Sequence, residues 1–570
     1  MKKDFNHFFA PVLFFNGVFI SCILSYSSAF AAESITPPTV VTCTADHCPL
    51  SVASLSRENL NEQVVIYQTS NKPEFMQQST QTFTNKDNGG WQSIVINESE
   101  LKNPTPIVGF GGAFTDAASM LYKNMSHRLQ QALINAFFSA QGIEYSLGRV
   151  PMASHDFSCR EEVSVNGKTI TRPSLTSCSA TASQYSYADV YDNTLSNFTL
   201  QPEDTDYKIP MIQAAIAAVN SNHNTLKLFA SPWSAPAWMK TNGSMVHGGL
   251  KPEFRQLWAN YFIKFLQAYK QHHILFWGLT VQNEPVDFGY LGTTLFQNWQ
   301  TMFSTEIEEG DFVKNYLGPT LKQFEQSYGT KIHLMIHDDQ VTTIEQRVTM
   351  LNDPEVSAYV DGAGLHWYMN NDQRFGNLDA AYQALNKPES DRKRFIIGTE
   401  ACEGYFPLNR GPLLGNWPRG ESYAHDIISD LNHYVSGWTD WNLVLDMQGG
   451  PNWAKNYVDA PMLFDLKSQT LYVQPMYYYL GHFSKFIRPG SVLLASQSRG
   501  PFPLEEVVFK VPAHGNLPEI ITIVVLNRDI TGRNYYIQDN SRPGKNKYLN
   551  MYIPAHAIQT IIFKSKSSSL

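Results

Sequence analysis

"PEFRQLWANYFIKFLQAYKQHHILFWGLTVQNEP", residues 252–285, contains the two patterns that decide the fold. In its first part the apolar residues fall on one helical stripe: Leu257, Tyr261, Phe262, Phe265, Leu266 and Tyr269. Pro252 stands where a helix begins. Its second part, 276–285, is an apolar run that stops on an amide, a carboxylate and a proline. The segment therefore predicts an amphipathic helix followed by a buried strand.

The same alternation recurs between about residues 105 and 445. Eight apolar runs end in polar or glycine-rich tips: "IVGFGGAFTD", "YSLGRVPMAS", "LKLFASPW", "FWGLTVQNEP", "HLMIHDDQ", "GLHWY", "FIIGTEA" and "GWTDWN". Strand and helix alternating eight times predict an α/β fold of the closed (β/α)₈ TIM-barrel type. An open doubly wound sheet is the alternative, but it normally carries a phosphate-binding turn. "GFGGAF" has Phe114 where the third glycine of that turn belongs.

The two ends of the chain have a different pattern. Alternating β-rich runs without helical stripes occupy residues 58–104 and 491–570. We expect them to meet in one all-β sandwich beside a barrel formed by residues 105–442 and 475–490. A small disulfide-bearing β subdomain is expected from residues 32–57 and 443–474.

The composition narrows the class of function. Of the 570 residues, 43% are hydrophobic and only 16% are charged, with a formal net charge of −8. A sizeable core is therefore possible, and we see no basic face of the kind that nucleic acids require. Aromatic residues, 13% of the chain, suit a protein that stacks rings on sugars but also a large core.

The first 31 residues resemble an export signal. Lys2 and Lys3 precede an apolar segment at 8–24, and Ala29-Phe30-Ala31 fits a cleavage site after Ala31 or Ala32. We expect a secreted or periplasmic protein, soluble because no later apolar run is long enough to span a bilayer. The alternatives are an uncleaved anchor and a lipid-modified Cys22.

Export determines how the remaining cysteines are interpreted. In an oxidising compartment, Cys43 with Cys48 and Cys159 with Cys178 are natural disulfides that close short loops. Metal binding is the alternative, but neither paired CxxC motifs nor an HExxH helix accompanies them. Cys402 is left over, and we interpret it as a buried apolar thiol.

Two of the eight strand tips end in glutamate. Glu284 ends the fourth run and Glu400 the seventh, so both are expected at the barrel mouth where the carboxyl ends of the strands meet. Each alone could be a solvated loop residue. Together they form the pair that hydrolysis of a glycosidic bond with retention requires, one acid and one nucleophile about 5 Å apart.

A set of motifs in order carries a resemblance: "FGGAFTDAA", "RVPMAS", "SPWSAPAWMKTNG", "NEP", "HWY", "TEAC", "GWTDWNL", "GGPNW" and "QPMYYYLGHFSKFI". Between about residues 105 and 490 the chain is similar to the lysosomal-type acid β-glucosidases (glucosylceramidases) of glycoside hydrolase family thirty. The flanks are similar more loosely, and Cys43 and Cys48 resemble the family's N-terminal disulfide. "NEP" alone occurs in many glycosidases, whereas the ordered set is specific.

The resemblance implies catalytic roles. Glu284 would be the acid/base and Glu400 the nucleophile. Arg149 would keep Glu400 ionised, although a structural ion pair is an equally ordinary use of an arginine. Tyr368 would hydrogen-bond the nucleophile, and His366 would order the site rather than transfer protons.

The resemblance also implies a glucose pocket. Asp116, Trp233, Trp441 and Asn456 match the family's sugar contacts, and Asn283 would donate to the sugar 2-hydroxyl. Taken singly, each tryptophan fits a core position equally well. Asp116 beside a Gly-Gly turn could equally be a helix cap.

The implied function is hydrolysis of glucosylceramide or a related β-glucoside, taken from a membrane or micelle surface, without cofactor or metal. Two segments depart from the family: extra polar sequence at 160–186, expected on the mouth side, and an altered "VDFGYLGTTLFQ" at 286–297. The alternatives are another family-thirty specificity (β-1,6-glucanase or xylanase), a catalytically silent glycolipid-binding protein, or transfer to sterol acceptors. The sequence reveals no activator partner.

Overall fold

The computed structural model describes residues 39–55, 60, 63–72, 74–222, 224–286, 298–387, 392–501, 503–542 and 547–566. The predicted export signal, its cleavage positions and Cys22 lie outside these residues, as does the 286–297 segment after Val286. Among the described helices, none combines the length and the hydrophobicity that crossing a membrane requires.

Each of the eight apolar runs contributes a strand to one parallel sheet. The strands are β5 (Gly109–Ala113), β6 (Leu147–Met152), β9 (Lys227–Pro232), β10 (Gly278–Thr280), β11 (His333–Gln340), β12 (Val360–His366), β13 (Phe395–Glu400) and β14 (Gly437–Asn442). They are neighbours in chain order, and β14 pairs with β5. A parallel bridge between Ile396 of β13 and Val435, just before β14, closes the ring. The predicted (β/α)₈ barrel is confirmed.

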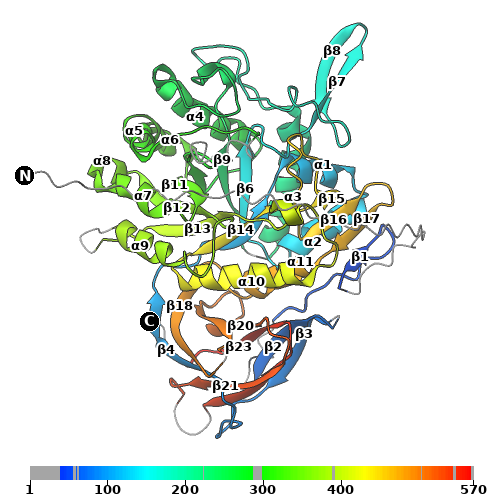
Figure 1. The fold of residues 1–570 in the computed structure, drawn as a ribbon, viewed down its shortest axis with the longest axis vertical. Coiled ribbons are helices and arrows are strands. Elements are labelled where there is room, and N and C mark those ends of the chain that lie inside the picture. The colour runs from blue at the N-terminus through cyan, green and yellow to red at the C-terminus, as the bar shows by residue number, and fades with distance from the viewer. Residues whose placement is uncertain are drawn as a thin grey trace, which may run out of the picture. The chain divides into compact units, whose positions relative to one another are not determined.

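Helices cover the outside of the barrel (Figure 1). The helix predicted from the opening segment is α4 (Arg255–Gln271), preceded by a 3₁₀ turn at Pro252–Phe254. Its predicted stripe is buried except for the half-buried Leu257. The other helices are α1 (Asp116–Asn124), α2 (His127–Phe138), α3 (Ile209–Asn220), α5 (Glu306–Phe312), α6 (Gly318–Tyr328), α7 (Ile344–Arg347), α8 (Pro354–Ser357), α9 (Gly376–Leu385), α10 (Trp417–Asn432) and α11 (Pro475–Ser484).

A nine-stranded sheet combines both ends of the chain. Its strands are β2 (Val64–Ser70), β3 (Glu74–Gln81), β4 (Ser93–Asn103), β18 (Val492–Arg499), β19 (Glu505–Val511), β20 (Ile520–Asn527), β21 (Arg533–Asp539), β22 (Tyr548–Ile553) and β23 (Ala557–Lys564). The order is β22-β21-β4-β18-β19-β20-β23-β2-β3, with only β21 and β4 parallel.

This sheet folds over on itself and so encloses a second core. Apolar side chains from both halves, such as Ile94 of β4 and Ile561 of β23, belong to one buried cluster. The hydroxyl of Tyr535 on β21 donates to Gln559 on β23 (2.8 Å), although these strands are far apart in the sheet order. The predicted sandwich is thus built from one continuous, folded sheet.

A small four-stranded sheet ties the N-terminal segment to the chain after the barrel. β1 (Val41–Cys43) pairs with β17 (Thr470–Val473), which is followed in order by β16 (Met462–Asp465) and β15 (Leu445–Asp446). Cys43 and Cys48 form a disulfide.

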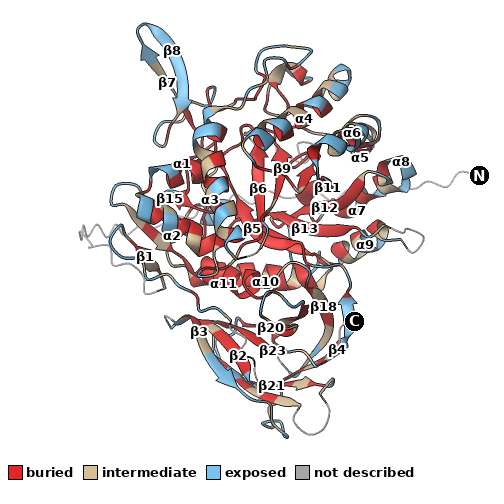
Figure 2. Ribbon diagram, turned by 180° about the vertical axis from the view of Figure 1, so that it is seen from behind, coloured by how far each residue is buried: buried red, intermediate tan, exposed pale blue. Residues whose placement is uncertain are grey.

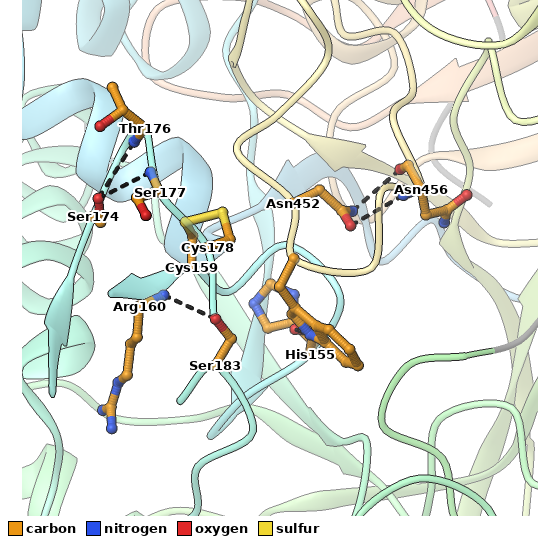
Figure 3. The surroundings of a disulfide bond; sticks show 11 residues. His155, Cys159, Arg160, Ser174, Thr176, Ser177, Cys178, Ser183, Asn452 and Asn456 are labelled. Carbon is orange, nitrogen blue, oxygen red and sulfur yellow. Dashed lines mark hydrogen bonds between the residues drawn. A yellow bond between two sulfur atoms is a disulfide. The ribbon is translucent and has the colours of Figure 1, made fainter. Parts of the chain in front are cut away.

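The polar insertion after β6 forms a hairpin that projects away from the barrel (Figures 1 and 2). β7 (Arg160–Val165) pairs with β8 (Lys168–Pro173), and Asn166 and Gly167 both have positive φ, as a tight two-residue hairpin turn requires. The Cys159–Cys178 disulfide closes the base of the hairpin (Figure 3). The hairpin follows a barrel strand, so it lies on the mouth side, as expected.

A buried carboxyl pair on α10 makes stability depend on pH. The amide of Asn370 donates to Asp426 (2.9 Å) and to Asp430 (3.3 Å). Burial raises the pKa of Asp426 to about 6 and that of Asp430 well above its usual range. Because the folded state binds these protons more tightly, their stabilisation is complete below about pH 4 and is lost as the pH rises through the folded-state values.

We therefore expect the melting temperature to fall between pH 5 and pH 8, and to fall less in Asp430→Asn, by at least about 2 °C. Thermal unfolding monitored by circular dichroism at both pH values tests this. Exposed Asp206→Asn is the control and should keep the wild-type difference between the two pH values. An equal fall in Asp430→Asn would contradict the assignment.

Candidate active site

Glu284 and Glu400 lie together at the carboxyl end of the barrel. Glu400 is the last residue of β13, and Glu284 lies just beyond the end of β10. They are 8% and 7% exposed, so solvent still reaches both. A carboxylate oxygen of each and a ring nitrogen of His366 all lie within 4.8 Å of one another. The barrel thus brings two sequence-distant carboxyl groups into one site.

The backbone at Glu284 adopts a conformation that is uncommon for a residue other than glycine. Its φ is 44°, in the left-handed region. Neighbouring strands hold this turn, because the N–H of Glu284 donates to the Asp338 carbonyl (3.0 Å) and that of Asn283 to the Pro232 carbonyl (2.9 Å). Backbone strain of this kind is often found at functional sites.

The carboxylate of Glu400 has a different partner on each oxygen. Arg149 donates to Oε2, and the Tyr368 hydroxyl donates to Oε1 (2.8 Å). Burial raises the pKa of Glu400, while the positive charges of His366 and Arg149 favour its ionised form. Arg149 and Tyr368 therefore lie where the sequence analysis expects them, against the predicted nucleophile.

Arg149 is completely buried and connects five barrel strands or their ends. Besides Glu400, its guanidinium donates to Ser231 (3.2 Å), Asn283 (2.8 Å) and Asp338 (2.9 Å). These contacts use all three nitrogens. A guanidinium held in this way fixes the position of the acceptors around it.

Glu284 is held by an amide and an imidazole. Gln340 Nε2 donates to Glu284 Oε1 (3.1 Å), and His366 Nδ1 lies 3.1 Å from the same oxygen. The other His366 nitrogen, Nε2, lies 3.1 Å from Asp338. Burial opposes protonation of His366, but Glu400, Asp338 and Glu284 outweigh it and raise its pKa to about 10. At neutral pH His366 is therefore an imidazolium in contact with both Glu284 and Asp338.

Trp233 and Trp441 form an aromatic wall next to Arg149. The two indoles stack with centroids 5.1 Å apart and an interplanar angle of 14°. The Arg149 guanidinium lies 4.8 Å from the Trp233 ring and 5.5 Å from the Trp441 ring. Both tryptophans are largely buried, so the wall contributes to packing as well as to the site.

Asp116 is completely buried and lies beside His155, whose ring packs against both tryptophans. Its Oδ2 accepts from Ser158 (2.5 Å) and Tyr185 (2.8 Å), and Lys208 Nζ lies 3.1 Å from Oδ1. Burial would raise its pKa, but Lys208 and His155 lower it below its usual range. The helix-cap interpretation is wrong, because Thr115 caps α1. The sugar-binding role of Asp116 stays a prediction.

Asn456 belongs to a hydrogen-bond network with Asn452 and Asp156. Its side-chain amide donates to Asp156 (3.1 Å), and its backbone N–H donates to the Asn452 side-chain oxygen (3.1 Å), as Figure 3 shows for the pair of asparagines. Asn283, by contrast, belongs to the central cluster through Arg149. The role predicted for Asn456 remains to be tested.

Three residues at the end of the fifth barrel strand, β11, belong to the site but were not predicted from the sequence. Asp338 contacts Arg149 and His366, and Gln340 contacts Glu284. Asp339 accepts the N–H of Val286 (2.9 Å), and burial together with Glu284 raises its pKa to about 7. Consecutive aspartates at the tip of an apolar run, in "HDDQ", were the signal that could have revealed them.

Cys402 is a free, buried thiol, which confirms the interpretation from the sequence. Its sulfur lies 3.3 Å from the Tyr368 hydroxyl. Burial raises the pKa of Cys402 well above its usual range, so the thiol stays protonated and unreactive.

Glu284, His366 and Glu400 are close enough to offer one ligand atom each to a metal ion. The electrostatics of the site oppose such binding, since His366 is held as an imidazolium and Arg149 contacts Glu400. A metal ion would have to displace a proton and compete with a buried guanidinium.

Known proteins are similar to this chain in fold and in sequence. The profile of the glycosyl hydrolase family 30 TIM-barrel domain matches residues 107–168 and 161–487. The lysosomal acid glucosylceramidase of Mus musculus is 37% identical over 467 residues, 80% of this chain and 81% of its own. The crystal structure of SrfJ from Salmonella typhimurium has a TM-score of 0.73 and 26% identity, covering 88% of this chain and 100% of that one.

A relative from Caenorhabditis elegans, whose name is "Putative glucosylceramidase 3", is 40% identical over 480 residues, 83% of this chain and 82% of its own. The family profile covers the barrel strands that bring both glutamates to the mouth. The chain therefore belongs to glycoside hydrolase family 30 and is a glycosidase.

Proposed function

We propose that the protein is a retaining β-glucosidase that hydrolyses glucosylceramide, or a closely related β-glucoside, to glucose and the free aglycone. One observation carries the mechanism: carboxylate oxygens of Glu284 and Glu400 lie within 4.8 Å of each other. Retaining glycosidases hold their two carboxyl groups about 5 Å apart, whereas inverting enzymes need about 6.5–9.5 Å to admit a water molecule.

In the first step Glu400 attacks the anomeric carbon and Glu284 gives its proton to the glycosidic oxygen. The carbon–oxygen bond to the aglycone breaks, and a glucosyl ester on Glu400 remains. Arg149 and Tyr368 hold Glu400 at one position for this attack. Asn283, fixed by Arg149, would bind the 2-hydroxyl, where a hydrogen bond strengthens in the transition state.

In the second step Glu284, now a carboxylate, takes a proton from water. The resulting hydroxide attacks the anomeric carbon, the ester bond breaks and glucose leaves with its original configuration. His366 and Gln340 keep the Glu284 carboxyl in place through both steps. No cofactor takes part in either step.

The choice of substrate rests on the sequence relatives. The mouse relative is named a lysosomal acid glucosylceramidase, and the small exposed parts of Trp233 and Trp441 would meet a sugar with apolar ring surface and indole donors. Asp116 and Asn456 would complete the glucose pocket. We further propose that the protein is exported and takes its substrate from a membrane or micelle surface.

A different specificity within the family is the main competitor. An endo-1,6-β-glucanase of Aspergillus fumigatus is 25% identical over 423 residues, 71% of this chain and 75% of its own. Such a glucanase, like a xylanase, would keep the same two glutamates. A silent glycolipid-binding protein would need neither, since sugar binding alone does not require an acid paired with a nucleophile.

The experiment is hydrolysis by the purified protein of detergent-dispersed glucosylceramide, in parallel with galactosylceramide, xylan and a β-1,6-glucan. We expect glucose from the first substrate only, and retention of the β-configuration in the initial product observed by proton NMR. Activity on a glycan alone would overturn the substrate but keep the mechanism. Inactivity on all four would favour a binding protein.

A further inference from the structure

Asp338 is a buried carboxylate in contact with one partner of each proposed catalytic glutamate. Its Oδ2 lies 2.9 Å from Arg149, and its Oδ1 lies 3.1 Å from His366 Nε2. Two hydroxyls also donate to it, from Thr280 (2.7 Å) and Thr399 (2.6 Å). The side chain is 0% exposed, so water does not replace any of these partners.

An irregularity of β11 places this carboxylate. The pairing of β11 with β12 shifts between His337 and Asp339, so Asp338 is an extra residue, and both His337 (74°) and Asp338 (51°) have positive φ. On β12, a Cβ added at Gly364 would lie 3.0 Å from the Cα of Asp338. A side chain at this position would crowd the bulge, so Gly364 favours it. Bulges that re-aim a side chain are frequent next to active sites.

We infer that Asp338 is a positioning residue for the proposed reaction, which holds Arg149 against Glu400 and His366 against Glu284. The inference rests on the proposed function for its catalytic consequence, but the contacts themselves do not. The backbone carbonyl of Asp338 accepts the N–H of Glu284 (3.0 Å), whereas its carboxylate acts on the two glutamates through the two cations.

The charges explain why a carboxylate is needed at this position. Arg149 and His366 are both fully buried, and a buried cation without an anionic partner is strongly disfavoured. As an imidazolium, His366 donates from Nε2 to Asp338 and from Nδ1 to Glu284. Without the charge of Asp338 it would lose one of the three carboxylates, with Glu400 and Glu284, that raise its pKa, and it would keep both donors over a narrower pH range. The contact to Glu284 would then weaken or reverse.

Other charged groups near Asp338 face it from different elements. Glu400 approaches from β13 and shares Arg149 with it. Glu309 on α5 is paired with Arg347. The neighbouring imidazole of His337 is kept neutral, because burial lowers its pKa to about 3. Arg149 and His366 are thus the two cations that contact Asp338 among the described residues.

The first test is kinetic and uses Asp338→Asn. On an aryl β-glucoside we expect kcat to fall at least about 100-fold with little change in KM, because sugar contacts remain while the glutamates lose their alignment. In the double variant with His366→Asn the further loss should be small, since the two residues act as one unit. A loss of kcat in the double variant that equals the product of the two single losses would overturn the inference.

Asp361→Asn is the matched control. Asp361 is a buried carboxylate at the opposite end of the neighbouring β12 and pairs with Lys331 and Arg392. The Asp361→Asn variant should be less stable than the wild type but have the same kcat and KM. If Asp338→Asn does not fold, Thr399→Val, which removes one hydroxyl from Asp338, should give a smaller fall in kcat alone. An unchanged kcat in that variant contradicts the inference.

A second readout does not depend on turnover. In protein with ¹⁵N-labelled histidine, the His366 resonance, assigned by its loss in His366→Asn, should titrate near its pKa of about 10 in the wild type. In Asp338→Asn the midpoint should fall by at least about one pH unit. If the wild-type protein is inactive on β-glucosides but the His366 midpoint still falls in Asp338→Asn, the positioning is supported and the proposed function is rejected. An unchanged midpoint in Asp338→Asn overturns the positioning.

Discussion

Glu400→Ala is expected to lower kcat on a β-glucoside by at least about 10⁵-fold, because it removes the carboxylate that we propose bonds to the anomeric carbon. KM should change little, since the contacts that bind glucose remain. Release of the aryl alcohol from an activated aryl β-glucoside, followed in a spectrometer, measures the loss. Glu403→Gln, a half-buried glutamate in the loop after β13, is the control and should retain wild-type activity.

Azide distinguishes loss of the nucleophile from loss of folding. The space left by the Glu400 carboxyl admits a small anion that can attack the anomeric carbon directly. A single displacement inverts the configuration, so the product is the α-glucosyl azide, formed only from a substrate with a good leaving group. Formation of the β-anomer, or full activity without azide, would show that Glu400 is not the nucleophile.

Much of the barrel could be predicted because the hydrophobic pattern of each strand and helix is contained in a short stretch of sequence. Each buried parallel strand reads as a short apolar run, and each covering helix as a stripe. In a closed parallel barrel the carboxyl ends of all strands meet at one mouth, so the sequence alone predicts that Glu284 and Glu400 lie near each other. The disulfides followed in the same way from spacing and from the expected compartment.

The residues that were missed depend on pairing between strands. The bulge at Asp338 lies against Gly364 of β12, where a Cβ would come 3.0 Å from the Cα of Asp338, and no pattern within "HLMIHDDQ" gives that register. The same holds for Asp116, whose charge is balanced by Lys208 from a π-helical turn at Glu203–Lys208. Such contacts depend on tertiary packing and cannot be predicted from the hydrophobic periodicity of one segment.

The two ends of the chain illustrate a similar limit. The β-rich runs predicted strands correctly, but they do not specify which strands pair. In the structure β4 is inserted between β18 and β21, so a strand from before the barrel joins strands from after it. Pairing over such a separation is decided by burial of a shared core and not by local propensity.

Glu284→Gln is expected to show losses that depend on the leaving group. With glucosylceramide, whose alkoxide is a poor leaving group, kcat/KM should fall about 10³–10⁴-fold because the glycosidic oxygen receives no proton. With an aryl glucoside that leaves without protonation, kcat/KM should fall far less. Steady-state rates on both substrates measure the difference. Glu309→Gln, a buried glutamate paired with Arg347, should lose equally little on both.

The second half of the reaction gives the sharper test of Glu284. Without a base to activate water, the glucosyl ester on Glu400 should accumulate, which predicts a burst of aryl alcohol and a lowered KM. Azide needs no base, so it should restore turnover in Glu284→Ala, and two successive inversions make the product the β-glucosyl azide. The α-anomer would instead mean that no ester formed. The opposite configurations expected from the Glu284 and Glu400 variants therefore assign the two roles independently of how large either loss is.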